Sequence, residues 1–450
     1  MIRPFPPAVF SSAVAAPRIW RQRPLVAAIT LLSAVAMPVQ VMAADPVGPP
    51  LAVFPQTGMT TQNAPAVARA PDGSFVVVWT DRLAGSVLGR RFAENGSPLD
   101  GGFVISAAVS GIDVAVDDTG RFLVAFSADS GRSVIARRYG ADGVPIGVDL
   151  LVDEAAEGEL LGPPAVAVDD DGDAVIAWRR SSQTASGGNA GQRIEARRLG
   201  AGDQLQGDRI VVANQPGDTA VSERDLFPNV AVAMDSDGDF ALSWLSRGET
   251  QIGIPLPIGY SSPIYLGFSL APQFIRFRRY DRLGRAVGIL RTVDGGPGLN
   301  AGPIRRLSEP ALTLSPGGDA VVSWQRGEAG NTPSMVLNRR YDAQARPVGG
   351  EIVSGTGQGV DVPAVAALGS GFVTSWTGVN SDLFLRLHGA NGAAQGSAVL
   401  VSGEPSARLR LPDLAADGGR FAIVWERNDS RLVTPVNFAE TIQLQLYSTP

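Results

Sequence analysis

Two aspartate-rich segments carry the clearest metal-binding pattern in this 450-residue chain. In both, carboxylates alternate around a glycine. These carboxylates belong to Asp169, Asp171, Asp173, Asp235, Asp237 and Asp239. Alternating carboxylates are typical of sites for Ca²⁺, which takes roughly six to eight oxygen ligands. Aspartate and glycine are also common in tight turns, and no glutamate follows where a calcium loop needs its bidentate ligand. We expect hairpin turns with no cofactor, and keep a calcium site on these six aspartates as the alternative.

The remaining composition excludes most other side-chain chemistry. The chain has no cysteine and no lysine, which removes thiolate and Schiff-base catalysis. Its one histidine, His388, leaves no multi-histidine metal site, and it stands where other copies of the repeat described below carry tyrosine. We find no nucleophile elbow and no phosphate-binding loop. Carboxylates therefore remain the main candidates for acid–base chemistry.

The N-terminal segment has the features of a secretory signal peptide. Three arginines between positions 18 and 23 precede an apolar stretch from Leu25 to about Met37, and small residues follow at Val41 and Ala43. The apolar stretch is shorter than the roughly 20 residues that a membrane span needs. We expect residues 1–43 to be removed on export, which leaves 44–450 in the periplasm or outside the cell with no transmembrane segment.

The charge of the exported part limits its partners. Residues 1–43 contain four arginines and no acidic residue, so their removal takes the formal net charge from −6 to −10. Nucleic acids and anionic lipids both bind to basic surfaces. We therefore expect no nucleic-acid partner.

The tryptophans reveal an internal repeat. After residue 43, every tryptophan falls at one position of a unit whose length is near 50 residues, and Phe126 fills that position in the one copy that lacks it. These aromatic residues define units one to seven in chain order: Trp79, Phe126, Trp178, Trp244, Trp324, Trp376 and Trp425. A repeat of this length fits a four-stranded propeller blade better than a helical repeat.

Each unit can be divided into four strands. The second strand is almost continuously apolar, as in Phe75–Trp79, which indicates a sheet covered on both faces. The last unit ends after three strands, and Pro46–Phe54 resembles the missing fourth. We therefore predict an all-β fold for 44–450. It is a seven-bladed β-propeller of four-stranded blades, closed by the N-terminal strand that completes the last blade.

The repeat resembles a family of units, each roughly 50 residues long, that is common in bacterial secreted and surface proteins. Asp72–Trp79 resembles the family's DGxFVVxW strand, and Ile135–Gly147 resembles its IxARRYxAxGxPxG segment. The resemblance covers essentially all of residues 46–450. It implies a propeller in an extracellular or envelope setting, often in adhesin-like proteins, and it implies no particular activity.

Three polar residues interrupt the small side chains of the predicted first strands. Asp113, Asn229 and Asp413 stand just after the opening position, where other units have alanine. We expect them near the mouth of the central channel, where converging polar groups can bind a ligand or an ion. Contact with channel water is the alternative.

Unit four contains an apolar insertion at about 251–272, between its second and third strands. The insertion is rich in proline and glycine and includes Tyr260, Tyr265 and Phe268. Loops in this position lie on the propeller face that usually carries sites. We expect either a surface that docks a partner or a lid over the channel mouth.

These features favour an exported, non-catalytic binding scaffold that uses one propeller face and the insertion to hold an envelope protein or a glycan. The first alternative is a polysaccharide-acting hydrolase or lyase at the channel mouth, which requires carboxylates that face each other. Asp113 and Asp413 are the one pair that the repeat places there. The second alternative is a calcium-stabilised adhesin-like module.

Overall fold

The computed structural model describes most of the chain after residue 43. The described ranges are 44–55, 60–107, 110–183, 189–215, 230–247, 250–255, 265–270, 273–295, 305–328, 334–357, 362–404, 407–429 and 439–449. The expected signal peptide lies outside these residues. Within them the regular structure is almost entirely β, with one short 3-10 helix, η1 (Val379–Ser381). No helix among the described residues has the length and apolar character of a membrane-spanning segment.

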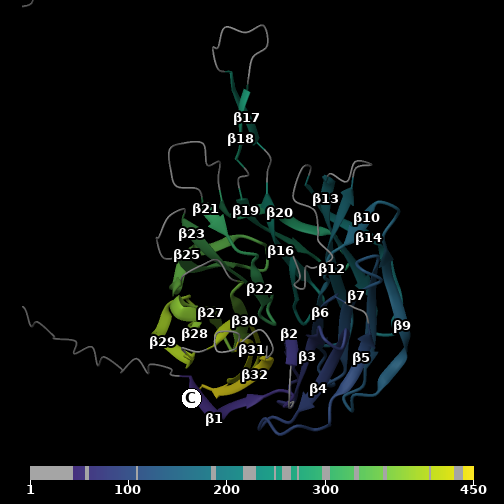
Figure 1. The fold of residues 1–450 in the computed structure, drawn as a ribbon, viewed down its shortest axis with the longest axis vertical. Coiled ribbons are helices and arrows are strands. Elements are labelled where there is room, and N and C mark those ends of the chain that lie inside the picture. The colour runs from purple at the N-terminus through teal and green to yellow at the C-terminus, as the bar shows by residue number, and fades with distance from the viewer. Residues whose placement is uncertain are drawn as a thin grey trace, which may run out of the picture. The chain divides into compact units, whose positions relative to one another are not determined.

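The described strands follow the repeat, and most units contribute four antiparallel strands in chain order (Figure 1). Unit one contains β2 (Thr60–Arg69), β3 (Phe75–Asp81), β4 (Ser86–Phe92) and β5 (Phe103–Ala107). Unit two contains β6 (Ser110–Val116), β7 (Phe122–Ala128), β8 (Ser133–Tyr139) and β9 (Pro145–Glu154). Unit three contains β11 (Ala165–Val168), β12 (Ala174–Gln183), β13 (Asn189–Leu199) and β14 (Leu205–Gln215).

The remaining units repeat this arrangement. Unit four contains β15 (Val230–Met234), β16 (Phe240–Arg247), β19 (Gln273–Tyr280) and β20 (Ala286–Gly295). Unit five contains β22 (Ala311–Leu314), β23 (Ala320–Glu328), β24 (Ser334–Tyr341) and β25 (Pro347–Gly357). Unit six contains β26 (Ala364–Leu368), β27 (Gly371–Thr377), β28 (Leu383–His388) and β29 (Ala394–Ser402). Unit seven contains β30 (Arg408–Asp417), β31 (Arg420–Asn428) and β32 (Ala439–Ser448). A β-propeller-like all-β fold is the result.

The N-terminal strand β1 (Asp45–Ala52) supplies a fourth strand to unit seven. It pairs antiparallel with β32, with Asp45 opposite Ser448 and Ala52 opposite Gln443. The Gln445 side chain adds a 2.9 Å hydrogen bond to the carbonyl of Gly48. The pairing covers an edge of β32 that would otherwise present free backbone groups, and it joins the two ends of residues 44–450.

The second strands form the most buried layer of each unit. All seven residues of β3 are buried, and the six repeat tryptophans are buried as well. Each buried cluster combines second-strand residues of one unit with those of the preceding unit, as where Trp178 packs with Leu123 and Ala125. Continuous apolarity therefore has the expected cause, because neighbouring sheets cover both faces.

The first strands lie next to one another at the inner side of the sheets. β2 contacts β6, β6 contacts β11, and contacts continue through β15, β22 and β26 to β30, which contacts β2. Five of these seven strands have alanine opposite the residue before the repeat aromatic, and a small side chain permits close approach of neighbouring strands.

Three short segments depart from the repeat. β10 (Glu159–Leu161) and β21 (Arg305–Leu307) precede the first strands of units three and five and pair with the ends of β12 and β23. In unit four, β17 (Thr250–Pro255) and β18 (Tyr265–Leu270) pair with each other as a hairpin between β16 and β19 (Figure 1). Part of the expected insertion is therefore a β-hairpin.

Gly355 tests how closely units five and six approach each other. A Cβ atom at this position of β25 would overlap the indole ring of Trp376. We expect Gly355→Ala to lower the free energy of unfolding by about 1–3 kcal/mol, the usual cost of overpacking. Gly350→Ala in the same strand is the control, because a Cβ there meets no atom within 4 Å. Equal denaturation midpoints for the two variants would contradict this packing.

Candidate functional site

Asp113 and Asp413 line one cavity of about 270 Å³, which is bounded by first-strand residues of all seven units. We call it the inner-strand cavity. Both aspartates are half-buried there. The rest of the lining is mainly alanine, valine, leucine and proline. The two carboxylates are therefore the charged groups that this lining supplies, in a setting that binding sites commonly show: apolar walls with a few polar groups.

Each of the two carboxylates hydrogen bonds to the backbone of the next unit. The amide of Val166 donates to Asp113 Oδ2 at 2.9 Å, and the amide of Val67 donates to Asp413 Oδ2 at 2.8 Å. Asp113 Oδ1 also accepts a 2.9 Å hydrogen bond from the amide of Val114. These bonds satisfy donors on strands whose inner edge has no neighbouring strand, and they fix the orientation of both carboxyl groups.

The surroundings make both groups weaker acids than a free aspartate. Burial raises the pKa of Asp113 to about 7, although the hydrogen bond from Val166 lowers it, and the negative charge of Asp413 adds to the rise. Burial likewise raises the pKa of Asp413 to about 6. The charge of Asp413 thus acts on Asp113, and near neutral pH the two carboxyl groups can exist in different protonation states.

The strand register shows which residue of each unit is equivalent to Asp113 and Asp413. In β6 and β30, Asp113 and Asp413 stand opposite the residue before the repeat aromatic. The five other units place alanine there: Ala66, Ala165, Ala231, Ala311 and Ala364. In unit four the residue is Ala231, so the assignment of this position to Asn229 is wrong. The error arose because the position was counted forward from Pro228. This proline lies two residues farther from Trp244 than the corresponding prolines of units one, three and five lie from the tryptophans of those units. Asn229 itself lies outside the described residues.

The backbone beside the cavity is strained at two positions. Ala64 and Leu411 line the cavity and have positive φ angles of 52° and 55°. Side chains other than glycine rarely adopt this left-handed conformation, and such strain is concentrated at functional sites. Both residues precede a proline and fall where the register of the first strand shifts.

One buried carboxylate near this cavity was missed in the sequence. Glu426 directly follows Trp425 on β31 and is fully buried. Burial raises its pKa to about 7, although Arg410, whose guanidinium lies 2.6 Å from Glu426 Oε1, lowers it. Arg410 immediately precedes Leu411 of the cavity lining. A glutamate directly after the repeat tryptophan of a second strand is the signal that could have identified it.

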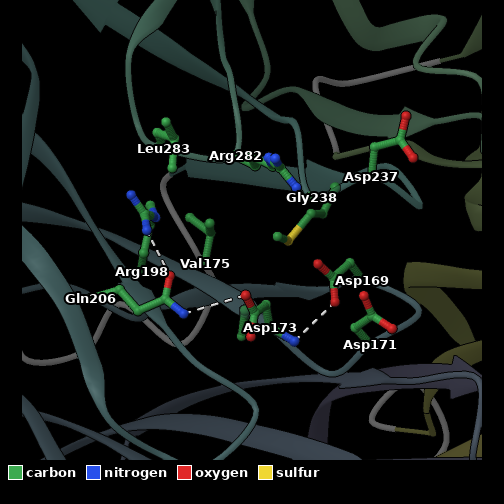
Figure 2. A pocket seen from close by; sticks show the side chains of 12 residues that line it. Asp169, Asp171, Asp173, Val175, Arg198, Gln206, Asp237, Gly238, Arg282 and Leu283 are labelled. Carbon is green, nitrogen blue, oxygen red and sulfur yellow. Dashed lines mark hydrogen bonds between the residues drawn. The ribbon is translucent and has the colours of Figure 1, made fainter.

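The six aspartates lie in the two turns that join the first strand to the second strand in unit three and in unit four. Asp169, Asp171, Asp173 and Asp237 line a second pocket, shown in Figure 2. No group of three or more acidic or histidine side chains in the described part of the chain is arranged to hold a metal. Within the turns, the amides of Asp173 and Asp239 donate to Asp169 Oδ1 and Asp235 Oδ1, both at 2.9 Å. The hairpin turns are thus confirmed, whereas calcium stays a prediction.

The aromatic residues of the insertion are only partly described. Tyr260 lies outside the described residues. In the hairpin register, Tyr265 stands opposite Pro255 and Phe268 opposite Ile252. The roles of docking surface and lid for these three residues therefore both remain predictions.

His388 occupies the aromatic position that the repeat indicates. Its ring stacks on Phe372 with centroids 4.5 Å apart, as Tyr139 stacks on Phe122 at 4.7 Å. The imidazole Nδ1 lies 3.2 Å from the carbonyl of Gly392, which makes Nδ1 the donor and leaves Nε2 to accept from Ser354 Oγ at 2.8 Å. Ser354 is completely buried. This serine–histidine pair therefore links units five and six and has no access for a substrate.

Comparisons with known proteins yield a fold but no family. No protein-family model matches the chain, and no curated protein matches it. An ulvan lyase of polysaccharide lyase family PL25, bound to a GlcA–Rha3S saccharide, aligns with a TM-score of 0.50 at 9% identity over 87% of this chain and 95% of the lyase. The GH93 α-L-arabinofuranosidase of Fusarium graminearum, in complex with arabinobiose, gives 0.44 at 10% identity over 91% and 98%. A protein of unknown function from Dyadobacter fermentans gives 0.46 at 11% identity over 92% and 100%.

These neighbours correct the leading functional interpretation. We expected a non-catalytic binding scaffold and hence no enzyme. That expectation is wrong: the ulvan lyase, which aligns with a TM-score of 0.50, is a polysaccharide-cleaving enzyme on a similar fold. Because the sequence identity between the lyase and this chain is only 9%, the likeness itself establishes a fold and no activity.

The raised pKa of Asp113 predicts a measurable pH dependence of stability. The unfolded carboxyl loses its proton near its ordinary pKa of 3.8 and the folded one near 7, so folding stability falls as pH rises between these values. Asp113→Ala introduces the residue that five other units have at this position, and it removes the titrating group. We therefore expect the variant to lose up to about 4 kcal/mol of this pH-dependent fall in stability, because each pKa unit corresponds to about 1.4 kcal/mol. Denaturant unfolding at acidic and alkaline pH measures the effect.

Thr313→Val provides the control for that experiment. Thr313 Oγ1 accepts a 3.1 Å hydrogen bond from the amide of Ala367 in the next unit, as the two aspartates do, but it does not ionise. We expect this variant to lose stability equally at all pH values. A pH slope that is the same in Asp113→Ala and in the unaltered protein would contradict the assignment.

Proposed function

We propose that this protein is a polysaccharide-acting enzyme, a hydrolase or lyase, whose acid–base pair is Asp113 and Asp413 in the inner-strand cavity. The observation that carries the proposal is the presence of two carboxylates with pKa values of about 7 and about 6 in one otherwise apolar lining. Glycan cleavage by paired carboxyl groups requires one of them protonated and the other ionised. The polysaccharide lyase that shares the fold gives this proposal a precedent.

The two pKa values assign the roles. Asp113, the weaker acid, retains its proton at near-neutral pH and serves as the general acid that protonates the leaving glycosidic oxygen. Asp413 is largely ionised at the same pH. In a hydrolase it activates water or attacks the anomeric carbon, and in a lyase it removes the proton next to a uronate carboxyl group. Their hydrogen bonds to Val166 and Val67 hold both carboxyl groups in position.

We also infer that the sheets form a closed seven-bladed propeller. The pairing of β1 with β32 supports closure, as do the contacts of β2 with both β6 and β30. A buried cluster that joins Trp79 of unit one to Ala422 and Val424 of unit seven supports it as well. The basic and apolar N-terminus supports export to the periplasm or the exterior, where polysaccharides are available as substrates.

Closure predicts that β1 matters for the stability of the whole fold. Deletion of residues 44–55 exposes the edge of β32 and uncovers Trp79, whose ring lies 5.7 Å from that of Phe54. We expect the deletion to lower the melting temperature by several degrees, and a synthetic peptide of residues 44–55 to restore it in part. An unchanged melting temperature would show that the first and last units do not stabilise each other.

The activity itself can be tested on a panel of neutral and uronate-containing polysaccharides. New reducing ends report cleavage, and ultraviolet absorbance of unsaturated uronate distinguishes elimination from hydrolysis. We expect Asp113→Asn and Asp413→Asn each to lower kcat at least about 100-fold, in line with the loss of an acid–base group. The optimum of kcat/KM should lie near pH 6–7, between the two pKa values.

Thr313→Val again controls for loss of an inter-unit hydrogen bond, and we expect it to keep full activity. Melting temperatures of all variants establish that they are folded. Activity of the unaltered protein that survives in both folded aspartate variants would refute the assigned pair. Absence of turnover on the whole panel, with the folded protein, would refute the enzyme proposal.

A further inference from the structure

Three turns of this protein share one geometry and allow an internal comparison. They begin at Asp117, Asp169 and Asp235, in units two, three and four, and each joins a first strand to a second strand. In each turn the aspartate Oδ1 accepts a hydrogen bond of 2.9–3.0 Å from the amide four residues later. All three side chains are at least nine-tenths buried. The difference that matters for binding is what reaches the other carboxylate oxygen, Oδ2.

In two of the turns, Oδ2 receives a guanidinium group from the protein itself. Arg121 Nε lies 2.8 Å from Asp117 Oδ2, and Arg279 Nη2 lies 2.6 Å from Asp235 Oδ2. Each guanidinium also donates to a carbonyl in the turn of the next unit, that of Asp171 or Gly318. The fold thus shows twice which kind of group this buried carboxylate binds: a planar cation with several N–H donors.

In the third turn, no described residue donates to Asp169 Oδ2 or forms an ion pair with Asp169. The position of Arg121 is taken by Asp173, whose carboxylate accepts from the amide of Ala201 and from Gln206. The position of Arg279 is taken by Arg198, which donates to Gln206 at 2.6 Å instead. Asp169 is only 8% exposed, and burial raises its pKa to about 6. Burial of a charged carboxylate without a neighbouring cation is energetically unfavourable, so a bound cation would stabilise this arrangement.

A pocket of about 210 Å³ opens at this carboxylate. We call it the Asp169 pocket. Figure 2 shows Asp169 with one oxygen bonded to the Asp173 amide and the other directed into the pocket. Arg198 and Arg282 lie across the pocket from it, and Asp171, Asp173 and Asp237 complete the charged lining.

We propose that the Asp169 pocket binds a small organic cation through a guanidinium or primary ammonium group seated on Asp169 Oδ2. The four acidic and two basic side chains of the lining leave a net negative charge, which attracts a cation. Arg198 and Arg282 supply donors for hydroxyl or carboxylate groups on the rest of the ligand. Arginine-like and amino-sugar ligands share this chemistry.

A bare metal ion fits the same pocket less well. Asp169 Oδ1 is already used by the Asp173 amide, and Asp173 by Ala201 and Gln206, so few of the oxygens that Ca²⁺ requires are available. The proposed site lies on the strand-one-to-strand-two turns and shares no lining residue with the inner-strand cavity. The inference is therefore independent of the proposed enzymatic activity.

Binding can be measured by calorimetry and by thermal shift on the exported protein, residues 44–450, at constant ionic strength. The probes are methylguanidinium, L-arginine, glucosamine and Ca²⁺, with tetramethylammonium as a cation that has no N–H donor. We expect methylguanidinium and arginine to bind and to raise the melting temperature. Binding of glucosamine but not of methylguanidinium or arginine would show that the pocket prefers a primary ammonium group. Tetramethylammonium should have no effect on the melting temperature.

Asp169→Asn is the decisive variant, because it keeps an oxygen for the Asp173 amide and removes the charge. We expect it to weaken methylguanidinium binding at least about tenfold, the scale of one charge-assisted hydrogen bond. Asp235→Asn is the matched control, because Arg279 already occupies Oδ2 of Asp235. We expect this variant to bind methylguanidinium with unchanged affinity.

A second measurement needs no variant. Binding to the unaltered protein should weaken as pH falls through about 6, because protonated Asp169 no longer attracts a cation. Affinity that is equal in Asp169→Asn and the unaltered protein, or an equal response to tetramethylammonium, would overturn the proposal. A response to Ca²⁺ that depends on Asp169, without a response to any N–H cation, would replace it with the metal site.

Discussion

The packing of one aromatic side chain against the preceding sheet is the constraint on which the rest of this structure depends. Trp178 in the middle of β12 packs on Leu123 and Ala125 of the unit before, and the other repeat aromatics are buried at corresponding positions. The first strands of sheets held this closely contact one another, and alanine occupies the position in question in five units. Where aspartate replaces alanine, its carboxylate lies within hydrogen-bond distance of the next unit's amide.

That closeness explains why the two inner aspartates have unusual acidity. A hydrogen bond to a charged group is worth roughly 1.5–3 kcal/mol, and the amides of Val114 and Val166 both favour ionised Asp113. The pKa of Asp113 nevertheless rises to about 7, so burial together with the charge of Asp413 outweighs both bonds. A purely structural acceptor needs no ionisable group, as Thr313 shows at the boundary between units five and six. The use of carboxylates at the cavity thus adds a proton-transfer capacity that the packing does not require.

The sequence was sufficient for features that depend on side-chain pattern alone. Apolar second strands, the position of each aromatic and the fourth strand at Asp45–Ala52 all follow from periodicity and turn residues. Register in unit four was not accessible in the same way, because the proline that opens its first strand is displaced and only the pairing with Trp244 shows it. Features that depend on the direction of a long side chain were also inaccessible. Arg198 and Arg279 occupy equivalent positions, yet one bonds a glutamine and the other an aspartate.

Because the fold is repeated, a residue in one unit can be compared with the residues at the equivalent position of the other units. Asp117 and Asp235 show that the turn aspartate is stable with a guanidinium on Oδ2, and the alanines of five units show that the inner strands are stable without a carboxylate. Asp169 without a cation and Asp113 with a raised pKa are both less favourable than the alternatives that the same fold contains. A group that is less favourable than the alternatives present in the same fold is better explained by what it binds than by what it holds together. For that reason we propose the two cavities in which these groups lie as the ligand-binding sites of this protein.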